Sequence, residues 1–130
     1  MGCLMLQVYL LYFDKEVLKI KAEVLQLHNE TAELLDQELH QVLQAEGYDF
    51  YDYSGEIAIL VDDRGFEKAL NPVFELVSVF GDRSRLAGRL VFVRNVENEY
   101  STDIGSIKYE DIFNLRISLD INLIGMTKEQ

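Results

Sequence analysis

Three short apolar runs constrain the fold of this chain more than any other feature of its sequence. Residues 4–13, 56–62 and 89–96 carry apolar side chains at nearly consecutive positions. Because neighbouring side chains of a strand point to opposite faces of a sheet, such runs predict strands that are covered on both faces. We expect the run at 56–62 to be a central strand of the sheet.

Residues 16–27 fit two kinds of secondary structure. Apolar and polar side chains alternate over 18–24, which indicates a strand, whereas apolar residues over 17–27 also recur at helical spacing. We favour a strand that pairs with the first one across a turn at Asp14 and Lys15. A helix is the alternative.

The next two elements have recognisable start and stop signals. Residues 31–46 predict a helix with Thr31 as its N-cap and Gly47 at its end. Residues 48–53 predict a strand that forms a hairpin with 56–62 across a short turn that contains a glycine.

The second half of the chain predicts a further helix, an acidic loop and a final strand. Asn71 and Pro72 fit a helix start, so residues 64–80 are predicted as helical, although their β-branched residues leave a strand as the alternative. Residues 97–111 predict a long acidic loop. The strict alternation of apolar and polar residues over 113–123 predicts a strand with one face on the core and the other in water.

Together these elements predict an α+β fold, with a single-layer, mostly antiparallel sheet and two helices packed on one face. Their central part follows the order βαββαβ, which resembles a ferredoxin-like core with added strands. The chain has 130 residues without a linker or repeats, so we expect a single domain over 1–130. Ferredoxin-like folds carry many unrelated functions, and the resemblance therefore implies nothing about activity.

The negative net charge of the chain favours some classes of binding partner over others. The net charge is −11, from 23 acidic and 12 basic residues, which disfavours direct binding to nucleic acid or to an anionic membrane. The same charge attracts basic proteins. Cys3 is the single cysteine, and no apolar run reaches the roughly 18 residues that a spanning helix needs. The apolar stretch 1–13 lacks a basic region and a small-residue cleavage site, so we expect it to be a strand rather than a signal peptide. We therefore expect a cytoplasmic protein.

No motif for catalysis, a metal or a cofactor is found in the sequence. The eight glycines are scattered and form neither a P-loop nor a dinucleotide-binding pattern. His28 and His40 do not stand in a ligand pattern with Cys3, and the acids of the predicted loop lack the spacing of a calcium site. We therefore expect no enzyme activity, no catalytic residue, no metal and no cofactor.

The stretch YDFYDYSG at residues 48–55 carries the strongest functional signal. It belongs to a segment, 46–63, that holds six acids and no base. In a strand its odd-numbered side chains share one face, which we expect to be exposed, and its even-numbered side chains share the face on the core. Tyrosines beside carboxylates are typical of protein contact surfaces. The predicted partner-binding residues are Asp49, Tyr51, Asp52 and Tyr53, together with Glu97, Glu99 and Asp103 of the acidic loop.

An arginine cluster supports a different hypothesis. Arg83, Arg85, Arg89 and Arg94 are a third of all bases within twelve residues. Guanidinium groups bind anions through several donors, so Arg83, Arg85 and Arg89 are candidate residues for an anionic ligand or substrate. The alternative is that Arg83 and Arg85 complement the C-terminal end of the predicted second helix and pair with nearby acids.

Three functions therefore stand as hypotheses. The favoured one is a small acidic module that masks a basic surface or active site of a partner protein, such as a toxin or a nucleic-acid enzyme. In composition the chain is similar to immunity proteins of nuclease toxins and to phage-encoded inhibitors. The alternatives are an anionic-ligand-binding or enzymatic module that uses the arginine cluster, and an oligomeric structural protein, for example a homodimer, that pairs through 113–123.

Overall fold

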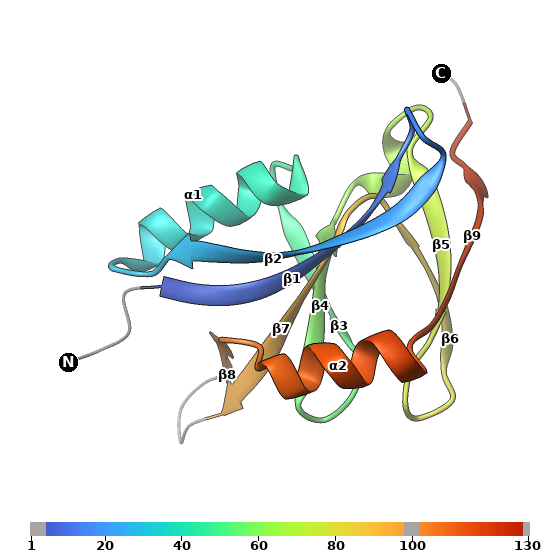
Figure 1. The fold of residues 1–130 in the computed structure, drawn as a ribbon. Helices are drawn as coiled ribbons and strands as arrows, with labels where there is room; N and C mark the ends of the chain where they lie inside the picture. Colours follow the sequence, from blue (N-terminus) through green and yellow to red (C-terminus); the bar gives the residue numbers. More distant parts are fainter. Residues whose placement is uncertain (1–4, 98–101, 129–130) are drawn as a thin grey trace.

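The computed structural model describes residues 5–97 and 102–128 (Figure 1). The elements in these residues are, in chain order, β1 (Met5–Asp14), β2 (Lys19–His28), α1 (Ala32–Leu43), β3 (Tyr48–Asp52), β4 (Ile57–Asp62), the 3-10 turn η1 (Gly65–Glu67), β5 (Pro72–Val77), β6 (Arg83–Ala87), β7 (Leu90–Glu97), β8 (Thr102–Gly105), α2 (Tyr109–Ser118) and β9 (Asp120–Met126).

The strands form two antiparallel sheets. The large sheet has the order β2-β1-β7-β4-β3, with β8 paired to β7, and the small sheet has the order β6-β5-β9. All pairings described between these strands are antiparallel. The predicted α+β class with mostly antiparallel strands is confirmed, whereas the prediction of a single-layer sheet is wrong.

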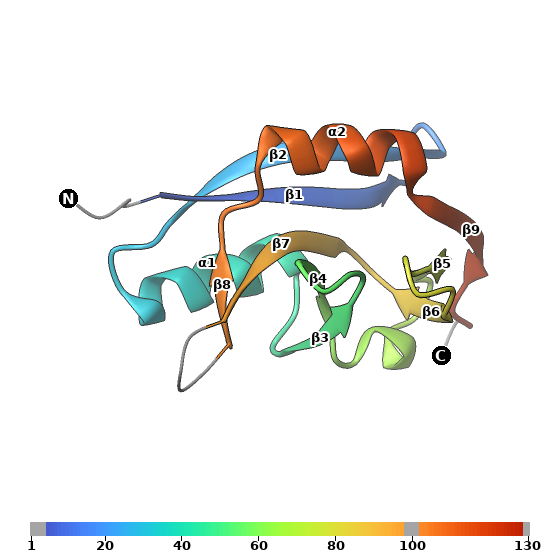
Figure 2. The ribbon, with the colours of Figure 1, turned by 90° about the horizontal axis from the view of Figure 1, so that it is seen from below.

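The two helices lie on opposite faces of the large sheet (Figures 1 and 2). On one face, Leu39 and Leu43 of α1 pack with apolar side chains of β1, β4 and β7. On the other face, Ile112 and Leu115 of α2 pack with residues of both sheets. The prediction that both helices share one face is therefore wrong, and the second helix is formed by Tyr109–Ser118 rather than by residues 64–80.

The three apolar runs form the strands at the centre of the large sheet, as predicted. β1, β7 and β4 are neighbours in the strand order, and all six residues of β4 are buried. Ala58 and Leu60 belong to the core on the α1 side, whereas Ile57, Ile59 and Val61 belong to the core on the side of α2 and the small sheet. A strand covered on both faces needs apolar side chains at consecutive positions, which is the pattern seen here.

The elements at the start of the chain, β1, β2 and α1, agree closely with the predictions from sequence. β1 and β2 form the predicted hairpin, with Asp14 opposite Lys19. Thr31 caps α1, since its Oγ1 accepts a hydrogen bond from Leu34 N at 3.0 Å. The helix ends earlier than predicted, because Gln44 rather than Gly47 takes the left-handed conformation at its C-terminal end.

Residues 64–80 do not form the predicted helix. They form η1 and then β5, whose Phe74 and Leu76 are fully buried while Glu75 is half-buried. Asn71 does not cap a helix; its Nδ2 donates to the carbonyl of Gly65 at 3.0 Å and closes the loop between η1 and β5. The alternative prediction of a strand, which was based on the β-branched and aromatic residues of this segment, is therefore correct for β5.

Residues 113–123 do not form one strand. Their first part belongs to α2, in which Ile112 and Leu115 are buried while Phe113 and Ile117 are exposed. Only the last part enters a strand, β9, where Ile121 and Leu123 pack against the core. β8 and the start of α2 lie within the predicted acidic loop, and the element order of residues 5–97 and 102–128 does not confirm a ferredoxin-like βαββαβ core.

Candidate functional site

The acidic residues are unevenly distributed along the folded chain. Residues 22–63, which run from β2 through α1 and β3 to β4, contain no lysine or arginine. The same residues contain eleven acids: Glu23, Glu30, Glu33, Asp36, Glu38, Glu46, Asp49, Asp52, Glu56, Asp62 and Asp63. All twelve bases of the protein lie outside this segment. The surface formed by the outer side of α1 and by β3 is therefore negatively charged, and we call it the acidic face.

A groove of about 660 Å³ lies on the acidic face, between α1 and β3. Leu35, Leu39, Tyr48 and Ile104 supply apolar surface to it. Its charged lining residues are Glu33 and Asp36, which are both exposed, and no lysine or arginine is among the described residues that line it. This α1–β3 groove thus combines an apolar floor with an acidic rim.

Tyr48 fixes β3 against α1. Its hydroxyl donates to Asp36 Oδ1 at 2.8 Å, and its ring contacts that of His40 edge-on, with centroids 5.6 Å apart. Burial and the hydrogen bond to Asp36 raise the pKa of Tyr48 to about 12. The hydroxyl therefore stays protonated at neutral pH and continues to donate, so that Asp36 is held at the rim of the groove.

Phe50 is the exposed aromatic residue of this face. Its side chain is on the same face of β3 as Tyr48, their ring centroids lie 6.0 Å apart, and the residue is 57% exposed. It lines the α1–β3 groove and also a second hollow of about 280 Å³, which is lined further by Asp52 and Asn95. An aromatic ring between two hollows, with carboxylates on either side, has the composition of an anchor residue in a protein interface.

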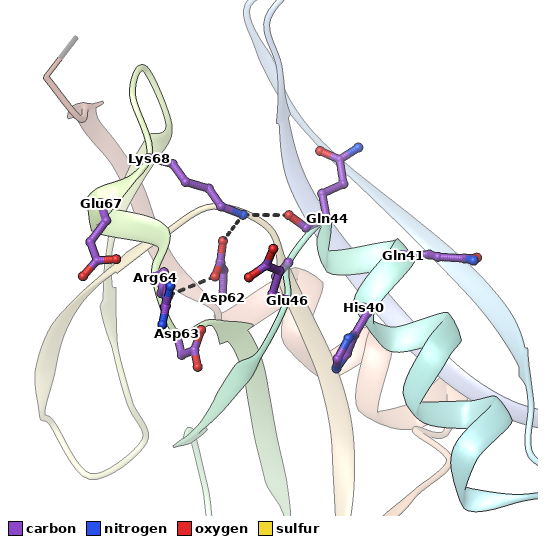
Figure 3. A pocket seen from close by; sticks show the side chains of 10 residues that line it. His40, Gln41, Gln44, Glu46, Asp62, Asp63, Arg64, Glu67 and Lys68 are labelled. Carbon is purple, nitrogen blue, oxygen red and sulfur yellow. Dashed lines mark hydrogen bonds and ion pairs between the residues drawn. The ribbon is translucent and has the colours of Figure 1, made fainter. Parts of the chain in front are cut away.

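A further pocket, also of about 660 Å³, lies at the C-terminal end of α1 (Figure 3). Its most buried carboxylate, Asp62, already has partners within the chain, since Oδ2 contacts Lys68 Nζ at 2.5 Å and Oδ1 accepts from Arg64 N at 2.9 Å. Lys68 also donates to the carbonyl of Gln44 at 2.8 Å. These bonds join the end of α1 to the end of β4. We therefore assign a structural role to the residues of this pocket and do not consider it the candidate functional site.

The structure reverses the predicted faces of β3. Asp49 is exposed, as expected, and Asp52, which was expected on the face toward the core, is exposed as well. Tyr53, however, is only 6% exposed and belongs to the core on the α2 side, and Tyr51 is half-buried against the same cluster. The prediction of two exposed tyrosines is wrong because α2 and the small sheet cover their face. Phe50, predicted to lie on the core, is the exposed ring.

The acidic-loop residues of the prediction are placed only in part. The backbones of Glu97 and Asp103 lie in the pair formed by β7 and β8, in which Val96 is opposite Asp103. Ile104, next to Asp103, lines the α1–β3 groove, so β8 borders the site. Glu99 lies outside the described residues.

The three candidate arginines do not meet. Arg83 Nη1 contacts Glu75 Oε1 at 2.8 Å on the small sheet, and Arg85 approaches the same carboxylate at 3.8 Å. Arg89 instead donates to the carbonyl of Val42 at 3.2 Å, near the end of α1. Arg83 and Arg85 thus pair with an acid, as the alternative held, although the predicted helix beside them is a strand. The structure brings no common anion site together from these residues.

Within the residues that the structure describes, no group of three or more His, Cys, Asp or Glu could hold a metal ion. None of the helices in these residues is long and apolar enough to cross a membrane. No known protein family matches the chain, and neither does a curated protein or a solved structure.

The α1–β3 groove was only partly visible in the sequence. The base-free acidic segment and the aromatic residues of 48–53 point to it, and both are local features of the chain. Ile104 is contributed by β8, 54 residues after Phe50, and no local pattern connects the two. The absence of lysine and arginine over the whole of 22–63 is the signal that locates α1 in the same surface.

Proposed function

We propose that this chain is a small acidic protein-binding module that covers a basic surface or active site of a partner protein, in the manner of an immunity protein or inhibitor. The observation that carries the proposal is the α1–β3 groove, with its apolar floor, its rim of Glu33 and Asp36, and the exposed ring of Phe50. Both elements between which the groove lies, α1 and β3, belong to residues 22–63, which contain no lysine or arginine.

The two parts of this surface have different physical roles. Burial of Phe50 and of the groove floor would supply most of the affinity, because a few desolvated anchors dominate the free energy of binding. The carboxylates of Glu33, Asp36 and Asp52 would raise the association rate and select partners of positive charge. A basic partner is favoured for the same reason that a second acidic protein is repelled.

Nucleic-acid enzymes and nuclease toxins are the partner class that this chemistry fits best. Such proteins bind phosphates through clustered lysine and arginine, and a carboxylate can occupy the place of a phosphate. A cytoplasmic location belongs to the same proposal and is supported by the single cysteine. Binding to such a partner requires no catalytic group in this chain.

The test is affinity capture from host lysate at low and at high salt, followed by mass spectrometry and by an activity assay of the captured protein. The acidic-face variant combines Glu33→Lys and Asp52→Lys. The control variant combines Glu16→Lys and Asp82→Lys, which change the net charge equally at exposed positions outside the groove.

We expect the wild-type and control proteins to retain a basic protein at low salt, to retain less of it at high salt and to inhibit its activity. The acidic-face variant should lose both effects. Equal retention by the two variants, or capture of no basic protein, would contradict the proposal.

A further inference from the structure

β3 is an edge strand of the large sheet. It pairs with β4 on one side, and in the strand order no other strand follows it. Among the residues that the structure describes, none makes a backbone hydrogen bond to the outer side of Tyr48–Asp52. An open edge of this kind presents unpaired N–H and C=O groups to which another strand can add.

The hydrogen-bond pattern shows which groups point outward. Tyr53 N donates to the carbonyl of Ile57 at 3.1 Å, and the carbonyl of Gly47 accepts from Asp63 N at 3.3 Å. Because alternate residues of an antiparallel pair carry the bonds, the odd-numbered residues of β3 bond to β4. The N–H and C=O groups of Tyr48, Phe50 and Asp52 therefore face the open edge.

The side chains along this edge disfavour pairing with a second copy. Two β3 strands placed edge to edge would bring Asp49 and Asp52 of both chains into one strand pair that contains no lysine or arginine, and such an accumulation of like charge disfavours the pair. The same carboxylates favour a strand that carries bases. The opposite edge of the large sheet, β2, lacks this selectivity, since it carries Lys19 and Lys21 as well as Glu23.

We propose that β3 binds an extended basic segment of the partner protein, which adds to the large sheet as an antiparallel strand beside Tyr48–Asp52. This inference rests on the proposed function and specifies its partner: a segment with lysine or arginine opposite Asp49 and Asp52 and an apolar residue opposite Phe50. Side chains of the added strand on the α1 side would meet Phe50 and Asp52, and those on the other side would meet Asp49 and Tyr51.

The register gives the sequence of a probe. Read against β3 in antiparallel direction, the peptide Lys-Thr-Val-Lys-Thr, with blocked ends, places its lysines opposite Asp52 and Asp49 and its valine opposite Phe50. The main-chain groups of that valine face those of Phe50. Replacement of the valine by proline removes one inter-strand hydrogen bond and retains an apolar side chain and both charges. Replacement of both lysines by glutamate retains the backbone and reverses the charge.

The experiment is an NMR titration of the whole protein with each peptide, with amide hydrogen exchange as the second measurement. We expect the parent peptide to slow the exchange of the Tyr48, Phe50 and Asp52 amides, while the Asp49 and Tyr51 amides, already bonded to β4, change little. The proline and glutamate peptides should each bind about tenfold more weakly or worse, because each lacks an interaction of the size of one hydrogen bond or ion pair.

The outcomes separate this inference from the proposed function. If the parent and proline peptides bind equally and the glutamate peptide does not, recognition by charge stands and strand addition is wrong. If none of the peptides binds, strand addition is also wrong, and the lysate experiment alone decides the proposed function. Protection of the same three amides that grows with protein concentration in the absence of peptide would assign the edge to a second copy and overturn the inference.

Discussion

The hydroxyl group of Tyr51 is buried, and its burial lowers the stability of the folded state. Its Oη is inaccessible to solvent and has no hydrogen-bond partner in the part of the chain that the structure describes. A buried polar group without a partner loses its hydration without replacement, which destabilises the folded state. At the same scale Tyr48 shows the opposite case, with a hydroxyl that donates to Asp36 at 2.8 Å.

We predict that Tyr51→Phe leaves the free energy of unfolding unchanged or raises it by about 1 kcal/mol, because it removes an unsatisfied hydroxyl. Tyr48→Phe, the matched control, should lower it by about 1 kcal/mol, because it removes a satisfied one. Urea unfolding of the three proteins measures both changes. A clear loss of stability in Tyr51→Phe would show that its hydroxyl has a partner.

The faces of β3 show why single residues of the site could not all be predicted. Asp and aromatic residues alternate on both faces of this strand, so its own pattern does not identify the buried one. The burial of Tyr53 and the exposure of Phe50 depend on α2 and the small sheet, which cover only one face. The presence of the strand was predictable, whereas the exposed aromatic residue was not.

At the scale of elements, a histidine–carboxylate pair joins β2 to α1. His28 Nδ1 lies 2.7 Å from Glu38 Oε1, and the other oxygen of Glu38 accepts from the backbone N–H of His28. The hydrogen bond to Glu38 raises the pKa of His28, and the same bond lowers the pKa of Glu38. The pair therefore stabilises the junction only where both groups are charged.

We predict a pH dependence of stability that follows from these two directions. The contribution of His28 is fully present below its unfolded pKa and is lost as the pH rises through its raised folded pKa. The contribution of Glu38 is present above its unfolded pKa and is lost as the pH falls through its lowered folded pKa.

Urea unfolding at mildly acidic and at mildly alkaline pH, for wild type and His28→Gln, measures the upper limit of this window. The advantage of the wild type should shrink as the pH rises from the acidic to the alkaline condition. An advantage that grows instead would contradict the assignment.

A second ion pair holds the start of α2 against β7. Arg94 donates to both oxygens of Asp111, at 2.8 and 2.9 Å, and Asp111 also accepts from Lys108 N at 2.9 Å. Burial raises the pKa of Asp111, but the bonds from Arg94 and Lys108 outweigh this effect and hold the pKa below its usual value. One carboxylate thus caps α2 and attaches it to the large sheet.

We predict that Asp111→Ala lowers the free energy of unfolding by about 2 kcal/mol, because it removes a helix cap and a bidentate ion pair together. Glu110→Ala, at an exposed position in the same turn, should change it by less than about 0.5 kcal/mol. Thermal and urea unfolding of both variants measure the difference. Equal effects would mean that the ion pair contributes nothing specific.

The elements that were predicted correctly are those whose local pattern has a single interpretation. β1, β4 and β7 follow from runs of apolar residues, and α1 follows from its spacing and its Thr31 cap. The helix α2 was missed because the apolar residues that it exposes and the ones that it buries together imitate the alternation of a strand. Asp111 favours the helix by capping it, and its partner Arg94 lies in β7, outside the local pattern.

At the scale of the whole molecule, charge is separated rather than mixed. Eleven acids and no lysine or arginine lie in residues 22–63, and five of these acids, Glu33, Asp36, Glu38, Asp49 and Asp52, lie in α1 and β3, so we expect repulsion among carboxylates on the acidic face. Such repulsion destabilises the compact state and is reduced when salt screens it. The two-sheet architecture, by contrast, depends on contacts between distant segments, and for this reason it was less accessible to sequence analysis than the charge pattern.

We predict that added sodium chloride raises the melting temperature of the wild-type protein, with most of the gain between about 20 and 300 mM, where the screening length falls to a few ångströms. The acidic-face variant, Glu33→Lys with Asp52→Lys, should gain less than the control variant, Glu16→Lys with Asp82→Lys. Differential scanning fluorimetry at several salt concentrations measures both gains. Identical gains would show that the repulsion is not concentrated on this face.

The base-free segment has a practical consequence for handling the protein. Its lysines are Lys15, Lys19, Lys21, Lys68, Lys108 and Lys128, and none of them is in residues 22–63. Reagents that react with amines will therefore attach the protein to a sensor surface, or label it with a dye, through positions other than α1 and β3. A molecule immobilised in this way keeps the side chains of its acidic face chemically unmodified.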